Sequence, residues 1–221
     1  MKNIIIFGAG DMAKIIMPIV ETEKKYKIVG LFDDFKQIGL NVMGYKVLGT
    51  LKELKNFVAN NNVYGGIVGI GDNYIRYKIV EKIKKIIPDF KFITTIHASA
   101  VVSRSASIGE GTFICPGVTI CNDVIIGNHC FIGPLSSFNH GCCMKDYSSI
   151  SAGVHVAGNA TLEKFVFLAV GAIVITHINI GEHTVIGAGS TVLKDIPSHV
   201  FAYGTPCKAT RRKQIGEKYF N

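Results

Sequence analysis

The chain has 221 residues, of which 48% are hydrophobic and 18% charged, and its formal net charge at neutral pH is +8. This composition excludes an intrinsically disordered protein, and the length allows one large domain or two small ones. No apolar run approaches the ~18 residues of a membrane span. The six cysteines contain no CxxC pair and fit neither a zinc site nor a disulfide framework. We therefore expect a reduced, cytoplasmic protein without a membrane partner.

The positive charge is unevenly distributed along the chain. Residues 1–92 carry 15 Lys and Arg against 9 Asp and Glu, residues 93–199 carry 4 against 6, and residues 200–221 carry 5 against 1. Nucleic-acid-binding proteins usually concentrate positive charge on one face together with aromatic side chains, whereas much of this charge is scattered over predicted helices. We expect no nucleic-acid partner and interpret the basic C-terminal segment as the neighbour of a small-molecule phosphate.

The first 92 residues alternate between predicted strands and predicted helices. In chain order we expect a strand at 2–7, a helix at 11–22, a strand at 27–32, a helix at 51–60, a strand at 65–70 and a helix at 73–87. Such alternation indicates a small parallel sheet with helices on both faces. We expect this Rossmann-like α/β lobe, residues 1–92, to be the first domain.

A glycine-containing turn and an acidic pair in this lobe indicate a nucleotide ligand. The G-x-G-x-x-A turn from Gly8 to Ala13 lets the backbone approach a phosphate or sugar at the positive end of the following helix. Asp33 and Asp34 follow the second strand, where acidic side chains accept hydrogen bonds from a ribose or a base. A lobe of about 90 residues has room for one mononucleotide-binding half, so a single nucleotide is favoured over NAD.

From residue 96 onward the sequence repeats with a period of six. All 17 positions reached in steps of six from Ile96 to Val192 are apolar, and four residues after each of them the side chain is small or β-branched. This hexapeptide pattern predicts a left-handed parallel β-helix, in which three hexads close a coil of about 18 residues. We expect the β-helix to occupy residues 93–196 and a C-terminal tail to occupy residues 197–221. Cys130 and Cys142 fall at inward positions and are predicted to be core residues.

The combination of lobe and coils resembles a known family. The segments Phe32-Asp33-Asp34-Phe35-Lys36 and Ile70-Gly71-Asp72-Asn73, the hexapeptide coils and the Gly204-Thr205-Pro206-Cys207-Lys208 ending are similar to acetyl-CoA-dependent acyltransferases of bacterial glycan synthesis. These enzymes comprise the N-acetyltransferases of nucleotide-linked 4-amino-sugars and the related sialic acid O-acetyltransferases. The resemblance covers essentially the whole chain.

The resemblance implies a role for each matching residue. The lobe of these enzymes binds the nucleotide-linked sugar, and the matching residues here are Gly8, Gly10, Asp33, Asp34, Lys36, Asp72, Asn73 and Arg76. Their catalytic histidine lies in a segment that matches residues 136–142, which makes His140 the general base. Their coils form a homotrimer in which acetyl-CoA, the co-substrate, lies between neighbouring subunits. The residues expected to contact acetyl-CoA are His155, Gly158, Pro206 and Lys208, with a backbone N–H near Gly158 serving the thioester.

Histidine suits this chemistry because its ordinary pKa of ~6.5 lets it accept a proton near neutrality, so no covalent intermediate is required. Relatives carry an acidic residue after the histidine, whereas this chain has Gly141, and the second histidine of some relatives falls on Ser149. A period of 18 stacks residue 123 beside residue 141. We therefore expect Asp123 to orient the His140 ring.

Three alternatives to amino-sugar N-acetylation remain open at this point. They are O-acetylation of a sialic acid or other sugar, a nucleotide-sugar-binding subunit without catalysis, and a zinc lyase of the carbonic-anhydrase type with the same fold. The lyase would need His140, His177 and His183 to converge, but His140 occupies a different position in its hexad from the other two, so no metal is expected. The histidines outside the predicted site, His177 and His183 included, are expected to be solvent-exposed. They are His97, His129, His177, His183 and His199.

Overall fold

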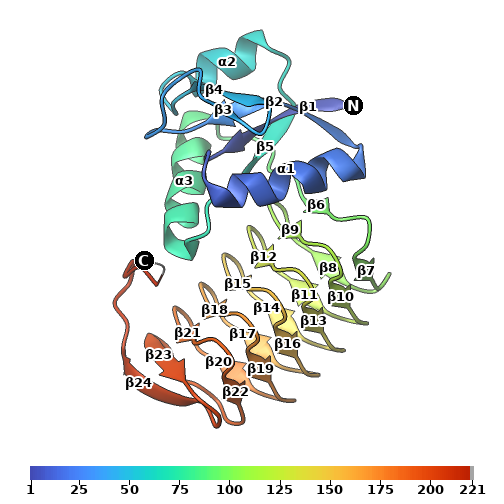
Figure 1. The fold of residues 1–221 in the computed structure, drawn as a ribbon, viewed down its shortest axis with the longest axis vertical. Coiled ribbons are helices and arrows are strands. Elements are labelled where there is room, and N and C mark those ends of the chain that lie inside the picture. Colours follow the sequence, from blue (N-terminus) through green and yellow to red (C-terminus); the bar gives the residue numbers. More distant parts are fainter. Residues whose placement is uncertain (220–221) are drawn as a thin grey trace.

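The computed structural model, which describes residues 1–219, consists of an α/β domain placed on one end of a column of stacked coils (Figure 1). The chain crosses from the domain into the first coil once. After the last coil it forms a hairpin at the far end of the column and then runs back toward the α/β domain (Figure 1). The predicted fold class is confirmed.

The α/β domain contains the three predicted strands and the three predicted helices. Its elements are β1 (Lys2–Phe7), α1 (Asp11–Glu23), β2 (Tyr26–Phe32), β3 (Asn41–Val42), β4 (Tyr45–Gly49), α2 (Leu54–Asn60), β5 (Gly65–Val68) and α3 (Asn73–Ile86). The strand order is β3-β4-β2-β1-β5, and every neighbouring pair is parallel except β3 with β4. The β3–β4 ribbon was not predicted, because its short, partly polar segments carry no clear period of two.

Alternate residues of β1 point to opposite faces of this sheet, as in any strand. Ile4 and Ile6 pack against the buried face of α1 in a core that continues into the coils. Ile5 and Phe7 pack with α2 and α3 in a second core on the other face. The carboxyl ends of β1, β2 and β5 therefore lie between helices on both sides, at the place where the strand order reverses.

The coils consist of 17 two-residue strands, each paired in parallel with the strand 18 residues away. They are β6 (Thr95–Ile96), β7 (Val101–Val102), β8 (Ser107–Ile108), β9 (Phe113–Ile114), β10 (Thr119–Ile120), β11 (Ile125–Ile126), β12 (Phe131–Ile132), β13 (Ser137–Phe138), β14 (Cys143–Met144), β15 (Ser149–Ile150), β16 (His155–Val156), β17 (Thr161–Leu162), β18 (Phe167–Leu168), β19 (Ile173–Val174), β20 (Asn179–Ile180), β21 (Val185–Ile186) and β22 (Thr191–Val192). They form the three faces of a left-handed β-helix. The antiparallel hairpin of β23 (Val200–Tyr203) and β24 (Lys208–Arg212) extends one face.

The hexapeptide prediction is confirmed in register. The second residue of every coil strand is the predicted apolar position, and from Ile114 to Val192 all of these residues are buried. Cys130 and Cys142 are buried as predicted, with 0% and 1% of their surfaces exposed. The first coil strand begins at Thr95 and the last ends at Val192, and the proposed boundaries after residues 92 and 196 stay predictions.

One corner of the β-helix carries a column of stacked rings. His129, Tyr147, Phe165 and His183 occupy left-handed turn positions 18 residues apart, and successive ring centroids are 5.1, 5.4 and 4.4 Å apart. The predicted exposure of His129 and His183 is wrong, because they are 1% and 7% exposed. We call these four residues the corner stack.

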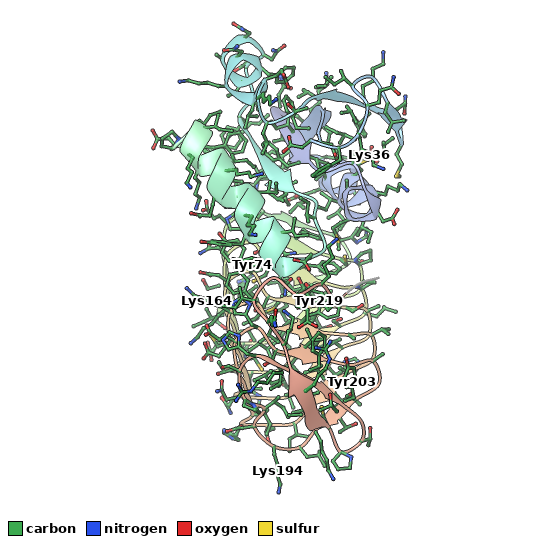
Figure 2. The ribbon with its side chains drawn as sticks, turned by 90° about the vertical axis from the view of Figure 1, so that its left-hand side faces the viewer. Lys36, Tyr74, Lys164, Lys194, Tyr203 and Tyr219 are labelled. Atoms are coloured by element: carbon green, nitrogen blue, oxygen red, sulfur yellow. The ribbon has the colours of Figure 1, made fainter. Side chains whose placement is uncertain are left out.

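Helix α3 covers the corner stack. Its Tyr77 makes edge contacts with the rings of Tyr147 and Phe165, and its Tyr74 makes edge contacts with Phe165 and His183. Figure 2 shows Tyr74 at the end of α3 that meets the coils. The hidden histidines are therefore explained by a domain contact that the repeat alone did not reveal.

Candidate functional site

A cavity of about 360 Å³ opens at the carboxyl ends of β1, β2 and β5. It is lined by five of the residues expected to bind the nucleotide, together with apolar side chains from the sheet and α3. These five are Gly8, Gly10, Asp33, Asp34 and Lys36. Five of the eight predicted residues are therefore brought together at a topological switch point, the usual ligand-binding position of such sheets.

The two glycines of the first turn have different structural requirements. Gly8 has a φ of +106°, and a Cβ built on it would lie 2.8 Å from the carbonyl oxygen of Gly69. Gly10 has no positive φ, and a Cβ built there would meet nothing within 4 Å. Gly8 is thus required by the backbone, whereas Gly10 leaves open space beside the N-terminus of α1, where backbone N–H groups favour an anion.

The two aspartates at the cavity hold its loops in place. Asp33 Oδ2 accepts a hydrogen bond from the backbone N–H of Ala9 at 2.8 Å, and its Oδ1 accepts from Phe35 and Lys36. Asp34 Oδ1 accepts from the backbone N–H of Leu51 at 2.9 Å. Both carboxylates keep free lone pairs for a ligand, so each of them both builds and lines the cavity.

The remaining three predicted nucleotide-binding residues lie elsewhere, and this corrects the expectation for them. Asp72 caps α3, accepting hydrogen bonds from the backbone N–H groups of Tyr74 and Ile75. Asn73 and Arg76 are each 1% exposed and do not line the cavity. The polar groups of Asn73 and Arg76 form hydrogen bonds in the contact between the α/β domain and the coils.

Arg76 is the centre of this contact. Its guanidinium donates hydrogen bonds to six acceptors, three from the α/β domain and three from the coils. They are the carbonyl oxygens of Ile70, Gly71, His129 and Tyr147, the amide oxygen of Asn73 and the hydroxyl of Ser149. Ser149 Oγ also donates to Asn73 Oδ1 at 2.6 Å, so Ser149 is a structural residue of the junction.

His140 lies in the turn that follows β13, at a different corner of the β-helix from the corner stack. Its ring is positioned above Gly158 of the next coil, where a built Cβ would lie 2.7 Å from His140 Nε2. Its Nδ1 lies 3.3 Å from Oδ1 of Asn139. Within residues 1–219 the backbone N–H of Gly158 makes no hydrogen bond. The corner thus presents an uncovered imidazole nitrogen beside a free backbone donor.

Asp123 does not contact the His140 ring, which corrects its predicted role. It lies in the preceding coil in register with Gly141, and the described chain contains no hydrogen bond or ion pair between Asp123 and His140. The space beside Gly141 is taken by Asn159, whose Oδ1 would lie 2.3 Å from a Cβ at Gly141. The partner of Nδ1 is Asn139, which the sequence pattern did not single out.

A shallow groove of about 230 Å³ runs beside this corner on the face formed by β7, β10, β13, β16, β19 and β22. Its polar lining consists of Cys121, Ser137, Asn139 and His155. Ser137 Oγ and His155 Nδ1 lie 2.8 Å apart and form a hydrogen bond. The predicted residue His155 is therefore placed next to the His140 corner.

Pro206 and Lys208 lie at the far end of the same column. The backbone N–H of Cys207 donates to the carbonyl oxygen of Thr191 in β22, which places the Pro206 turn at the end of the grooved face. Lys208 begins β24 and is exposed. The turns of His140 and Lys194 are three coils apart, or ~14 Å at the usual strand spacing of ~4.8 Å.

Residues 1–219 contain no group of three His, Cys, Asp or Glu side chains arranged to hold a metal ion. No helix in this part of the chain has the length and hydropathy needed to cross a membrane.

Comparisons with known proteins agree with this architecture. Residues 3–83 match the family model of the PglD N-terminal domain. The perosamine N-acetyltransferase of Caulobacter crescentus, solved with CoA and GDP-perosamine, is 30% identical with a TM-score of 0.81, covering 96% of this chain and 98% of that one. A variant of it in which a histidine is replaced by asparagine gives a TM-score of 0.90 at 29% identity over the same shares. The acetyltransferase domain of PglB from Neisseria gonorrhoeae gives 0.87 at 26% identity, over 95% and 100%.

Curated relatives are similar to this chain over short segments. The galactoside O-acetyltransferase of Lactococcus lactis is 51% identical over 51 residues, which is 23% of this chain and 25% of that protein. The chain therefore spans about a quarter of the length of this relative.

Proposed function

Because the chain belongs to the hexapeptide-repeat sugar acetyltransferases with a PglD-type N-terminal domain, we propose that it transfers an acetyl group from acetyl-CoA to the amino group of a nucleotide-linked deoxy-amino-sugar. The observation that carries this proposal is the coexistence of the cavity at β1, β2 and β5 with the exposed His140 corner in one chain. The similar enzyme of Caulobacter crescentus was solved with both CoA and GDP-perosamine.

In this proposal the nucleotide lies in the cavity of the α/β domain. The backbone N–H groups at the start of α1 face its phosphates or sugar, and Asp33 and Asp34 accept hydrogen bonds from its ribose or base. Lys36 supplies a positive charge at the same cavity. In this arrangement the α/β domain holds the nucleotide end of the substrate. It does not have to supply a group that takes part in the acetyl transfer.

Acetyl-CoA lies along the grooved face, with its thioester near Gly158 and its phosphates toward Pro206 and Lys208. The basic segment after β23 supports this orientation, because Lys208, Arg211 and Arg212 are all exposed there. The ~14 Å between the His140 corner and the last coil is spanned by an extended pantetheine arm. His155 lies beside this path.

The sugar ammonium first loses a proton to solvent, and His140 Nε2 then accepts a proton from the neutral amine as its nitrogen bonds to the thioester carbon. The carbonyl oxygen becomes negative and is stabilised by the free backbone N–H of Gly158. Cleavage of the carbon–sulfur bond then expels the CoA thiolate, which takes up the proton held by His140. Atoms balance with an amide and free CoA as products, and no metal or oxidant takes part.

We propose that the working form is a homotrimer in the cytoplasm, where acetyl-CoA and nucleotide sugars are made. Residues 93–199 carry only 10 charged side chains, and outward residues such as Val101, Ile125 and Ile173 are 66%, 55% and 44% exposed. Closed cyclic assembly would cover this apolar surface. Sedimentation of an active monomer at micromolar concentration contradicts this assembly.

The activity is tested by measuring free thiol with acetyl-CoA and a panel of UDP-, dTDP- and GDP-linked amino-sugars. Release with at least one amino-sugar is expected, and His140→Ala should lower kcat by ~10² to 10⁴. Treating the product with hydroxylamine separates N- from O-acetylation, because it cleaves an acetyl ester and leaves an amide intact. An ester product supports the sugar O-acetyltransferase alternative, and no thiol release with any sugar contradicts the proposal.

A further inference from the structure

The side chain of Asn139 is held in one orientation by the backbone that follows it. Its Oδ1 accepts a hydrogen bond from the backbone N–H of His140 at 3.0 Å. A backbone N–H can donate only to the amide oxygen, never to the amide nitrogen. The oxygen of Asn139, and not its NH₂ group, therefore faces the His140 ring.

The same oxygen lies 3.3 Å from Nδ1 of His140. An amide oxygen is an acceptor only, so this contact is attractive when Nδ1 carries the ring proton and repulsive when it does not. A neutral imidazole with its proton on Nδ1 has its lone pair on Nε2. Nε2 lies above Gly158, where a side chain would collide with it.

We propose that Asn139 is the positioning residue of the acetyl transfer, fixing the His140 tautomer so that Nε2 is the proton acceptor. This inference rests on the proposed function. It replaces the carboxylate expected at Asp123, and the position after the histidine cannot supply one, because Asn159 fills the space beside Gly141. A neutral amide orients the ring without adding the charge that a carboxylate would place beside the imidazolium.

The first test compares Asn139→Ala and Asn139→Asp with the wild type. Asn139→Ala should lower kcat by ~10- to 100-fold while the KM for the nucleotide sugar stays within about twofold, since the nucleotide is held in the cavity of the α/β domain, which Asn139 does not line. Asn139→Asp keeps the acceptor, so it should recover most of this loss. It should also move the acid limb of the kcat profile to higher pH, because a carboxylate stabilises the imidazolium.

The other titratable groups near the ring are the same in the wild type and in both variants, so they cancel in this comparison. Cys121 and His155 line the adjoining groove. Asp123 and His177 occupy turns of the same corner, one coil before and two coils after the His140 turn, and neither is hydrogen-bonded to the ring in the described chain. Asn56→Ala is the matched control, because Asn56 is an exposed asparagine of α2 without a side-chain hydrogen bond in residues 1–219. It should leave kcat, KM and the pH profile unchanged.

The double variant His140→Ala/Asn139→Ala should be no slower than His140→Ala alone, because Asn139 acts only through the histidine. Independent, multiplicative losses overturn the inference and leave the proposed function intact. An active His140→Ala instead contradicts the proposed function.

The tautomer of His140 can also be measured in the wild-type protein, so this test does not depend on whether the Asn139 variants fold. In ¹⁵N-histidine NMR above the titration range, the signal that disappears in His140→Ala should show a protonated Nδ1 and an unprotonated Nε2. The opposite tautomer overturns the inference whatever the variants do.

Discussion

The hydroxyl of Tyr219 accepts a hydrogen bond from the backbone N–H of Asn73 at 2.8 Å across 146 positions of sequence. Its ring stacks on Phe167 of the coils at 4.6 Å, and Figure 2 shows it beside Tyr74 where α3 meets the column. Asn73 is the first residue of α3, and Gly71 two residues before it lines the cavity of the α/β domain. The C-terminal segment thus fixes one wall of a cavity in the N-terminal domain.

Tyr219→Phe should therefore weaken nucleotide binding without touching the acetyl-CoA path. We expect the KM for the nucleotide sugar to rise several-fold, in line with a net hydrogen bond of ~0.5 to 1.5 kcal/mol, while the KM for acetyl-CoA is unchanged. Tyr64→Phe is the control and should change neither value, because Tyr64 lines neither the cavity nor the groove and its hydroxyl makes no hydrogen bond within residues 1–219. Equal changes in both KM values would contradict this role.

The two glycines of the first turn should respond differently to the same substitution. Gly8→Ala places a Cβ 2.8 Å from a carbonyl oxygen at a φ of +106°, so we expect a lower melting temperature. Gly10→Ala meets open space and should melt like the wild type, but with a raised KM for the nucleotide sugar, because the methyl group borders the cavity. Calorimetry and initial rates on both variants check this, and a strongly destabilised Gly10→Ala refutes it.

Arg76→Ala should be among the most destabilising changes in the chain. It removes a donor from six buried or partly buried acceptors, and each buried acceptor left unsatisfied costs ~1 to 3 kcal/mol. Urea unfolding measures the loss, with exposed Arg104→Ala as the control. A loss below ~1 kcal/mol would show that water or a rearranged neighbour satisfies these acceptors.

His129 makes stability depend on pH. Burial, with a smaller contribution from Lys84 and Arg76, lowers the pKa of His129 to about 3, and neither ring nitrogen has a hydrogen-bond partner in the described chain. Below pH ~6.5 the unfolded chain takes up a proton that the folded chain refuses, so the free energy of unfolding should fall as pH decreases from ~6.5 toward 3, by up to ~1.4 kcal/mol per unit.

His129→Phe should flatten this dependence, whereas the exposed His177→Phe should not. Some slope should remain in His129→Phe, because burial also lowers the pKa of His183 to about 4. Urea denaturation at several pH values between 4 and 7 measures the slopes. Parallel curves for the wild type and His129→Phe would show that His129 does not titrate on unfolding.

The period of six predicted the β-helix because each hexad contains, within six residues, both the apolar residue that points inward and the turn that follows it. A ligand site in the α/β domain was also predictable from local sequence. Gly8 and Asp33 directly follow two strands that are neighbours in the sheet, so they lie at the same edge of it. Arg76 and Asn73 were assigned to the nucleotide-linked sugar from the family resemblance, whereas the structure places both in the contact between the α/β domain and the coils, which residue types alone do not reveal. Asn139 was missed because its role depends on where one amide oxygen points, and no pattern of residue types encodes that.

The six hydrogen bonds of Arg76 also bear on how substrates enter. A hinge between the α/β domain and the coils would have to break buried, charge-assisted bonds at each turnover, together with the aromatic contacts of α3. The two domains therefore form a rigid frame whose shape is set when the chain folds. Substrates should reach and leave this frame without waiting for a domain to open, so a slow closure step should be absent from the kinetics.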